Sequence, residues 1–472
     1  MSTQTTTQQM KRELGLLDAT LLVAGGMIGS GIFIVSADIT RNVGSAGWLL
    51  AVWLLGGFMT LTAALSYGEL SGMYPKAGGQ YIYLKEAFNP LIAFVYGWSL
   101  FAVIQTGTIA AVGVSFSKFL SYFIPQVADD LVLFQWGTWS VSPAQLLAIG
   151  LICFLTYINT RGVKGGKWVQ TIFTSTKVFS IMVLILLGFL IYKSEVWDLN
   201  WQDAWQLQKR DRAGTLSGYP SAPAWWGGLA AGMVGAIMSY EAWNNVTFVA
   251  SEINNPRRNI GLSLLLGTLL VTLLYVAINL MFLYVLPITE IAGAAKDRVG
   301  IAASEVILGS SGTILISVMI LISTFGCNNG LILAGARVYY SMAQDGLFFK
   351  KTAQLNKHAV PAFALWIQAA MASLLCLTGK YGDLLDMITF VVVIFYVLTI
   401  VGIYILRVKK PLHERPYRAI GYPILPALYI LMGVAFCVLL IIFKPTYTWP
   451  GFFISALGIP LYYWVKRRAP SY

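Results

Sequence analysis

Four glycines in one apolar segment are spaced so that a small zwitterion could bind to the backbone among them. The segment reads LLVAGGMIGSGIFIV, and the residues concerned are Gly25, Gly26, Met27, Gly29, Ser30 and Gly31. Each glycine weakens a helix by about 1 kcal/mol relative to alanine, so the cluster predicts an unwound stretch. Freed N–H groups at the start of the resumed helix attract a carboxylate, and freed carbonyls attract a cation. Close packing of helices through small residues is the alternative interpretation.

A second apolar segment, GAIMSYEAWNNVTFVASEINNPRRN, is interrupted by Ser239, Tyr240, Glu241, Asn244 and Asn245. Glu241 lies near the middle of this segment, where a carboxylate is costly in a membrane and indicates a functional site. A glutamate that is protonated, or that is held by neighbouring hydrogen-bond donors, is the other interpretation. In both interpretations the polar run predicts a second break in a helix.

Two cations also lie inside apolar segments. Lys177 stands deep in WVQTIFTSTKVFSIMVLILL, where its ammonium either points inward or extends along the helix to the inner surface. Arg337 lies about two turns from the inner end of its segment, eight residues before Asp345. There we expect an interior ion pair rather than contact with a substrate.

The elements that carry these residues are expected to span a membrane. The chain has 472 residues, of which 57% are hydrophobic and only 11% charged, whereas soluble domains have about 25% charged residues. A span needs about 20 apolar residues, and such segments follow one another along the whole chain. We therefore expect an all-α integral membrane protein of about twelve transmembrane helices, at residues 15–40, 46–73, 90–124, 144–161, 168–192, 226–250, 261–287, 308–344, 360–379, 383–407, 421–443 and 449–465.

The positions of lysine and arginine predict the orientation. If the N-terminus is cytoplasmic, about twice as many of these residues fall in the inner loops as in the outer loops. We therefore expect a multi-pass protein of a cell membrane with both termini in the cytoplasm. The net charge of +12 is then explained by basic loop residues that face anionic lipid and set the orientation, and not by binding of nucleic acid. No cleavable signal is recognisable ahead of the first span, which we expect to be retained.

The sequence does not predict an enzyme. Its two histidines, His358 and His413, fall in or beside expected inner loops, and it contains no H-E-x-x-H, G-x-S-x-G or Walker-type motif. The four cysteines have neither zinc-ligand nor redox spacing. We expect no catalytic residues, no cofactor and no metal. A channel would need a continuous polar lining, whereas the polar positions here are isolated at two breaks.

Breaks in the first and sixth spans stand at matching places in two five-span halves. This is the sequence pattern of an inverted-repeat transporter with a binding site near the middle of the membrane. We expect one transporter domain over residues 1–465. It would contain a first repeat at residues 15–192, a second repeat at residues 226–407 and two additional helices at residues 421–465.

Five motifs together are specific to one family. They are GGMIGSGIF (residues 25–33), YGELSGMYPKAGGQYIYLKEAF (67–88), VQTIFTSTK (169–177), SYEAWNNVTFVASEINNPRRNI (239–260) and STFGCNNGLILAGARVYYSMAQDG (323–346). Through them the chain, over about residues 13–465, resembles the amino acid–polyamine–organocation superfamily, and within it the L-amino acid transporter-like branch. The resemblance implies a leucine-transporter-like fold of two inverted five-helix repeats.

The resemblance also implies roles for individual residues. The substrate carboxylate would be held by the backbone amides of Gly29, Ser30 and Gly31. The substrate amino group would be held by carbonyls near Gly26, Met27, Met238, Ser239 and Glu241. Lys177 matches the family lysine that occupies the place of a sodium ion in sodium-coupled relatives, with Ser323 or Cys327 as its partner on the eighth span.

Four positions depart from the family pattern. Met238 stands where the family has an aromatic gate, and a flexible thioether can still cover a site. Glu241 stands where relatives have aspartate or glycine, and Cys327 where some have serine. Gly261 stands where a proline commonly follows the conserved Asn-Pro pair.

The expected function is secondary active transport of L-amino acids by alternating access, independent of sodium and by exchange. The alternatives are a proton-coupled symporter of amino acids, a carrier of polyamines or organocations, and a sensor that binds amino acids without transporting them. The expected partners are the amino acid and the lipid bilayer, with the protein a monomer or a weak homo-oligomer. Animal members pair with a single-span glycoprotein through a cysteine in the loop between spans three and four. Residues 125–143 contain no cysteine, so we expect no disulfide-linked heavy chain.

Overall fold

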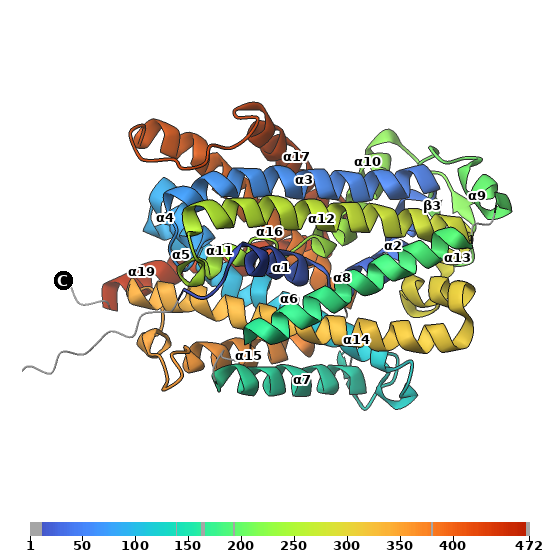
Figure 1. The fold of residues 1–472 in the computed structure, drawn as a ribbon, viewed down its shortest axis with the longest axis horizontal. Coiled ribbons are helices and arrows are strands. Elements are labelled where there is room, and N and C mark those ends of the chain that lie inside the picture. The colour runs from blue at the N-terminus through green and yellow to red at the C-terminus, as the bar shows by residue number, and fades with distance from the viewer. Residues whose placement is uncertain (1–11, 138, 162–165, 192–193, 379–380, 469–472) are drawn as a thin grey trace, which may run out of the picture.

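The computed structural model describes residues 12–137, 139–161, 166–191, 194–378 and 381–468. Long helices run roughly parallel to the longest axis of the molecule and leave short connections at its two ends (Figure 1). Both described ends of the chain lie at the left-hand end in Figure 1, which we call the inner end. The opposite end, which carries α9, α13 and β3, is called the outer end.

The described residues of the first half of the chain form nine α-helices. They are α1 (Leu16–Met27), α2 (Gly31–Val43), α3 (Ala46–Met73), α4 (Gln80–Ala87), α5 (Pro90–Ser99), α6 (Gln105–Leu120), α7 (Pro143–Thr160), α8 (Gly166–Leu190) and α9 (Ser194–Trp201). A π-helical turn, Leu100–Ile104, joins α5 to α6. Two small antiparallel ribbons lie in loops: β1 (Phe134–Trp136) pairs with β2 (Trp139–Val141), and β3 (Lys209–Arg210) pairs with β4 (Leu216–Ser217).

In the second half, ten α-helices lie within the part of the chain that the structure describes. They are α10 (Ala222–Ser239), α11 (Asn245–Phe248), α12 (Pro256–Val285), α13 (Ile288–Gly293), α14 (Val299–Gln344), α15 (Ala362–Cys376), α16 (Tyr381–Lys409), α17 (Ile424–Phe443), α18 (Pro445–Ala456) and α19 (Gly458–Arg468). Short 3-10 turns occur at Pro125–Val127, Ala250–Glu252, Ala295–Asp297 and Lys350–Ala353.

The structure confirms an all-α membrane architecture. Among the described residues, eight helices are long and apolar enough to cross a membrane, and the bent pair formed by α1 and α2 adds a ninth candidate. The remaining expected spans correspond to α10 with α11, to α15, and to α18 with α19, which are shorter or divided. The count of twelve spans therefore stays a prediction.

Local sequence explains where several helices begin and end. Asn89 accepts a hydrogen bond from the Ile92 amide at 3.0 Å, with Pro90 in the first helical position of α5. Ser142 and Gln145 form a reciprocal capping box at the start of α7. Gly44 ends α2 in the left-handed conformation (φ 74°), which glycine adopts without steric cost.

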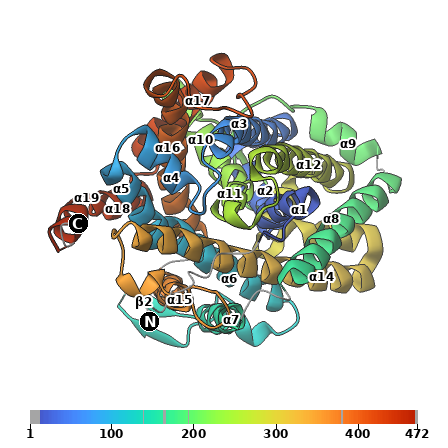
Figure 2. The same ribbon diagram turned by 60° about the vertical axis from the view of Figure 1, so that its left-hand side comes forward.

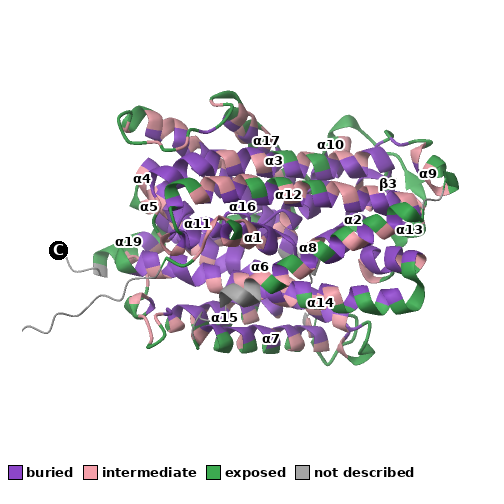
Figure 3. Ribbon diagram, viewed as in Figure 1, coloured by how far each residue is buried: buried purple, intermediate pink, exposed green. Residues whose placement is uncertain are grey.

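Burial divides the helices into an interior group and a peripheral group. Figure 2 shows α1, α2 and α11 between α3 and α12 on one side and α6 and α14 on the other, with α10 beside α3. Helices α7 and α8 expose one face each (Figure 3), and the residues exposed there are large and apolar: Leu146, Phe154, Phe179 and Leu186. Apolar outer faces of this kind fit a lipid environment. The two predicted breaks thus lie on interior helices, shielded by others.

Candidate substrate site at two broken helices

The first predicted break is confirmed. Helix α1 ends at Met27, α2 begins at Gly31, and the two helix axes are bent by 43°. Only Ile28, Gly29 and Ser30 separate the two helices. The Gly29 amide turns back to the Met27 carbonyl at 2.9 Å. The glycine cluster therefore produces an unwound stretch inside the protein, although its glycines also pack closely against neighbouring helices.

Free donors lie at the start of α2. Among the described residues, no hydrogen-bond acceptor is found for the backbone N–H groups of Ser30, Gly31 and Ile32, and the Ser30 hydroxyl does not cap the helix. The three groups lie in the first turn of a helix of 13 residues. The positive end of the helix dipole acts at the same place. This arrangement can bind an anion.

The carbonyls at the end of α1, in contrast, are all occupied by donors from other helices. Lys177 Nζ on α8 donates to Gly25 O at 3.0 Å and to Ile28 O at 3.1 Å. From α14, Ser323 Oγ donates to Ile28 O at 3.3 Å and Cys327 Sγ donates to Gly26 O at 3.3 Å. The structure thus brings together the three residues that the sequence assigns to a built-in cation and its partners.

Lys177 does not extend to the inner surface. Its side chain is buried, with only 3% of the residue exposed, and its ammonium points to the break. The alternative interpretation, in which Lys177 snorkels, is therefore wrong for this structure. An ammonium in this position supplies one positive charge and two hydrogen bonds to carbonyls that lipid could not satisfy.

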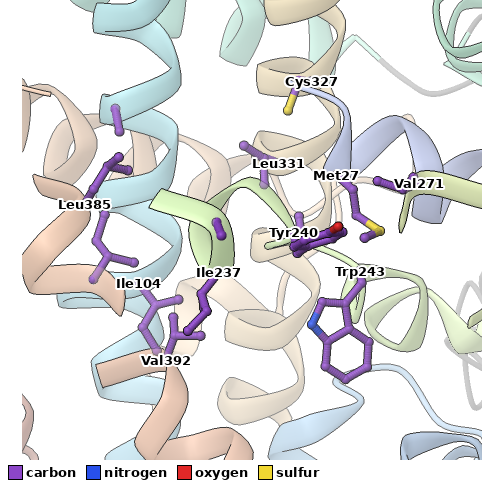
Figure 4. Packing of buried hydrophobic residues seen from close by; sticks show 14 of the residues in the cluster. Met27, Ile104, Ile237, Tyr240, Trp243, Val271, Cys327, Leu331, Leu385 and Val392 are labelled. Carbon is purple, nitrogen blue, oxygen red and sulfur yellow. The ribbon is translucent and has the colours of Figure 1, made fainter. Parts of the chain in front are cut away.

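The second predicted break is also confirmed. Helix α10 ends at Ser239 and α11 begins at Asn245, with a turn between them. Within the turn, Ala242 adopts φ 70°, a left-handed conformation that costs about 1–3 kcal/mol for a residue with a side chain. Two aromatic residues of the turn, Tyr240 and Trp243, are almost fully buried. Figure 4 shows both beside Met27 of the first break.

The two breaks touch each other. A Cβ atom at Gly26 would lie 3.3 Å from Ala242 O, and one at Gly31 would lie only 2.4 Å from Ser239 Oγ. A side chain at either position would therefore force the breaks apart. The absence of a side chain at these two glycines permits the close approach, and the space for an added Cβ atom is smaller at Gly31 than at Gly26.

A tyrosine that sequence reasoning missed joins the two breaks. Tyr275 on α12 places its hydroxyl 2.8 Å from Met27 O and 3.1 Å from Ser239 O. The residue is fully buried. Tyr275 lies in the apolar run VTLLYVAINL, and nothing in its local pattern separates it from a core aromatic residue.

Several of the carbonyls assigned to the substrate amino group already accept hydrogen bonds. Met27 and Ser239 accept from Tyr275, Gly26 accepts from Cys327, and Met238 accepts from the Glu241 amide at 3.2 Å. Each carbonyl oxygen has two lone pairs, so a carbonyl with one donor can accept a second. Met27 O already accepts from both the Gly29 amide and Tyr275, so a further donor there must displace one of them. The Met238 side chain is partly buried and packs against the hydrophobic core.

Glu241 faces a small polar cavity. Its Oε1 accepts from Tyr396 at 2.8 Å, and its Oε2 has no hydrogen-bond partner among the described residues. Asn244 donates to Gln80 Oε1 at 3.0 Å on the same cavity. A hydrogen-bonded glutamate was one of the two interpretations open from the sequence, and Tyr396 supplies the donor. The cavity lies against the second break, between α4, α6 and α16.

The inner end of the site is closed mainly by backbone contacts. Leu14 forms a parallel bridge with Ile253, and the amides of Glu13 and Leu14 donate to Glu252 O at 2.9 and 3.1 Å. Arg337 Nε donates to Glu252 Oε1 at 3.0 Å, which confirms the expected interior ion pair of Arg337. Opening this end requires separating the chain before α1 from the segment after α11.

The outer end is closed by charges that converge on one carboxylate. Asp297 accepts from Arg41 at 2.9 Å, from Lys118 at 3.4 Å and from Arg212 at 3.4 Å. We call these four residues the outer ion cluster. Burial alone would raise the pKa of Asp297, but Lys118 and Arg41 hold it below its ordinary value. Asp297 also has a left-handed backbone (φ 61°), so its position is held against local strain.

In the part of the chain that the structure describes, no group of three or more histidine, cysteine, aspartate or glutamate side chains is placed to hold a metal ion. The four cysteines, Cys153, Cys327, Cys376 and Cys437, are free.

Comparisons with known proteins agree with this geometry. A family model described as "Amino acid permease" matches residues 14–463. A serine/threonine exchanger of Bacillus subtilis is 28% identical over 98% of both chains. The b(0,+)-type amino acid transporter 1 of Mus musculus is 27% identical over 94% of this chain and 86% of its own. The large neutral amino acids transporter small subunit 2 of Homo sapiens is 28% identical over 96% of this chain and 80% of its own.

The family match covers nearly the whole described fold, including both breaks and Lys177. The family and these relatives are membrane transporters of amino acids rather than enzymes, so the chain is a multi-pass membrane protein that binds amino acids as small-molecule substrates. The chain belongs to the amino acid permease family and is a transporter of amino acids.

Proposed function

We propose that the chain exchanges L-amino acids across the cell membrane by alternating access, without sodium. The observation that carries this proposal is the contrast at the first break. Three backbone N–H groups at the start of α2 have no acceptor among the described residues, while the carbonyls a few residues earlier are occupied by Lys177, Ser323, Cys327 and Tyr275. Free N–H groups that can bind an anion thus lie beside carbonyls that are already occupied by protein donors. This arrangement suits a substrate that carries a carboxylate.

The substrate carboxylate binds the N–H groups of Gly29, Ser30 and Gly31. Of these, Ser30 and Gly31 are free and Gly29 donates to Met27 O. The amino group binds carbonyls at Gly26 and Met27 of the first break and at Met238, Ser239 and Glu241 of the second. Because several of these carbonyls already accept protein donors, the amino group shares them or displaces Tyr275. The two breaks must also separate, since Gly31 and Ser239 are now in contact.

Lys177 replaces a sodium ion. Its ammonium lies within hydrogen-bond distance of Gly25 O and Ile28 O, which are the ligands that a cation would take at this place. A covalently attached charge cannot leave, so it stabilises the break throughout the cycle and does not carry a gradient.

Alternating access requires two closures that open in turn. The outer ion cluster closes one end and the contacts of Leu14, Glu252 and Arg337 close the other. Both are formed in this structure, so the proposed site is shut from both ends. In the proposed cycle each closure breaks once per turnover.

The wider architecture of the proposal follows the inverted repeat. Residues 15–192 and 226–407 are the two five-helix repeats, and residues 421–465 are two additional helices. The inner end of the bundle is cytoplasmic, with both termini there. The protein acts as a monomer or weak homo-oligomer without a disulfide-linked heavy chain, because residues 125–143 contain no cysteine.

A proton-coupled symporter is the second candidate function. The observation that favours it is the pair of buried ionisable side chains at the breaks, Lys177 and Glu241. Each could change charge during the cycle, and Glu241 has a carboxylate oxygen without a partner among the described residues. A carrier of polyamines would use the same site at the two breaks but would not need a place for a carboxylate. A sensor that does not transport would use the same site but would not need two closures that open in turn.

Purified protein in liposomes tests these functions. A thermal-shift screen against twenty amino acids first identifies the ligand, because a ligand at 100 times its Kd stabilises by about 2.7 kcal/mol. Uptake of that amino acid should require the same amino acid inside, should persist when choline replaces sodium, and should ignore an imposed pH gradient. Accumulation driven by an acidic exterior would instead support proton symport, and loss of uptake without sodium would overturn the role of Lys177.

Competition experiments test separately the groups proposed to bind the carboxylate and those proposed to bind the amino group. The amide of the amino acid and the corresponding amine without a carboxylate should both compete poorly. Strong competition by the amine would move the assignment to polyamines or organocations. Binding without uptake under any gradient would indicate a sensor.

A further inference from the structure

The loop between α6 and α7 forms a hairpin of unusual composition. Strands β1 and β2 pair with Phe134 opposite Val141 and Trp136 opposite Trp139, and Leu133 N donates to Val141 O at 2.8 Å. We call residues 131–141 the apolar hairpin. Their sequence, LVLFQWGTWSV, contains no aspartate, glutamate, lysine or arginine.

The first strand of the apolar hairpin and the residues just before it expose large side chains on both faces. Neighbours on a strand point to opposite sides, so one of two consecutive residues normally packs inward. Here Val132, Leu133 and Phe134 are 56%, 59% and 56% exposed, and Trp136 is 78% exposed. Neither face of the first strand therefore rests on the protein. Soluble surfaces rarely expose such a contiguous apolar patch without a partner.

The second ribbon of the same end provides a contrast. Strand β3 carries Lys209 and Arg210, and the turn that leads to β4 carries Asp211 and Arg212. Arg210 donates twice to Gly44 O, at 3.1 and 2.9 Å, which fixes this ribbon on the end of α2. One outer ribbon is thus charged and fixed on the protein, whereas the other is apolar and extends from it.

The apolar hairpin continues the lipid-facing surface of the bundle. It leads directly into α7, whose outward residues include the exposed Leu146 and Phe154, and it follows the exposed Phe123 and Ile124 at the end of α6. In Figure 1 the cyan segment between α6 and α7 lies at the outer end, on the edge of the molecule beside α7. Its base is held to the bundle by Asp130, which accepts from Lys296 at 3.1 Å.

We propose that the apolar hairpin inserts into the outer boundary between lipid headgroups and acyl chains. Tryptophan favours this layer because its ring is apolar and its indole N–H is polar. The uncharged composition, the exposure of both faces and the continuity with α7 all fit lipid as the occupant. Insertion anchors the outer ends of α6 and α7 in the membrane while other helices move. This anchoring does not depend on which amino acid is carried or how transport is coupled.

Site-directed spin labelling of full-length protein in liposomes tests the proposal. A nitroxide is attached to V132C, which keeps Trp136, and in a second sample to S217C on the charged ribbon. Unaltered protein treated with the label measures the background from the native cysteines. Collisions with oxygen, which concentrates in lipid, are compared with collisions with a water-soluble nickel chelate.

The label at position 132 should show a several-fold higher ratio of oxygen to nickel collisions than the label at position 217. Adding Trp136→Asp to V132C should lower the ratio toward that at position 217, because a charged residue is costly in the acyl layer. Equal ratios at the two positions would overturn the proposal. Dipolar broadening between labels at position 132, with low collision rates for both reagents, would also overturn it and would assign the hairpin to contact between two copies of the chain.

Discussion

At both helix breaks, backbone groups that leave the helix need hydrogen-bond partners, and the two breaks obtain these partners in different ways. At the first break, carbonyls from Gly25 to Ile28 are satisfied by side chains that come from α8, α12 and α14. The second break has backbone bonds of its own, from the Glu241 amide to Met238 O and from the Asn245 amide to Ala242 O. It is also tied to other helices, because Tyr275 reaches Ser239 O, Tyr396 donates to Glu241, and Tyr240 donates to Trp53 O on α3. The first break thus depends on side chains from other helices, whereas the second also has hydrogen bonds within its own turn.

This difference predicts which substitutions should disturb each break. A change on another helix can disturb the first break, because the donors there have no local substitute. The second break should tolerate the loss of a distant partner better. The following variants test the comparison, beginning with the largest expected effect.

Gly31→Leu should abolish binding and transport. A Cβ at Gly31 would lie 2.4 Å from Ser239 Oγ, and leucine would also cover the N–H groups proposed to bind carboxylate. The thermal shift with the identified amino acid should disappear while the protein still reaches the membrane. Gly150→Leu is the matched control, because a Cβ there meets nothing within 4 Å. Full transport by the Gly31 variant would indicate that the glycine cluster serves only the close packing of helices and not substrate binding.

Lys177→Ala should reduce transport by about tenfold to a hundredfold, since removing a charged hydrogen-bond donor costs roughly 1.5–3 kcal/mol. The carbonyls of Gly25 and Ile28 then lose their shared donor. Initial uptake rates in liposomes measure the effect. Lys209→Ala, on the exposed outer ribbon, should behave as the unaltered protein. A Lys177→Ala protein that regains uptake only with sodium would sharpen the cation assignment, and one with normal uptake would contradict it.

Tyr275→Phe should raise the KM by roughly twofold to tenfold, because the net value of a neutral hydrogen bond is about 0.5–1.5 kcal/mol. Its hydroxyl is shared between Met27 O and Ser239 O, so its loss loosens both breaks at their contact. Exposed Tyr463→Phe is the control. A KM unchanged by Tyr275→Phe would mean that the two breaks move independently.

Tyr396→Phe should have a smaller effect, about threefold or less, if the second break is held locally. The variant removes the hydroxyl that donates to Glu241 Oε1 at 2.8 Å, while Tyr240 and Trp243 stay in place. Uptake rates measured beside those of Tyr275→Phe give the comparison directly. A loss as large as that of Lys177→Ala would show that the second break depends equally on distant residues.

Cys327→Ser should change transport least. A serine hydroxyl can still reach toward Gly26 O, now 3.3 Å from the thiol sulfur, and it is the stronger donor. Uptake should stay within about a factor of two of the unaltered rate, with Cys153→Ser as control. Inactivity of Cys327→Ser would indicate that the larger sulfur atom, and not its hydrogen bond, positions Gly26.

Much of the fold could be predicted because spans and breaks are local properties. Residues 46–73 were expected as one span and form α3 over the same residues. The glycine cluster and the polar run around Glu241 both predicted breaks that the structure contains. The inverted repeat and the roles of the site residues remain predictions.

The contacts between distant residues could not be predicted in the same way. Tyr275 and Met27 are separated by 248 positions, and the partners of Asp297 come from three segments. Neither residue has a local pattern that indicates its partners. The bend within the longest helix, at Gly309 (φ 67°), was also not expected, because single glycines are common in membrane helices.

The outer ion cluster has a consequence for how the two faces of the membrane respond to solution conditions. Because its cations hold the pKa of Asp297 below the usual value of about 4, acidification lowers the strength of this closure only below that pH. Ionic strength acts mainly on Arg212, whose side chain is 71% exposed, because dissolved salt screens charges that solvent can reach, with a Debye length of about 8 Å at 0.15 M. Arg41, Lys118 and Asp297 are largely buried and are screened much less. The inner closure consists of backbone hydrogen bonds at Glu252 O and of the Arg337–Glu252 ion pair, in which Arg337 is only 4% exposed, so salt screens it less. With the outer end facing the exterior, as proposed above, external salt should weaken the contact of Arg212 and favour the state open to the outside, and the two faces should show half-saturation constants with different salt dependence.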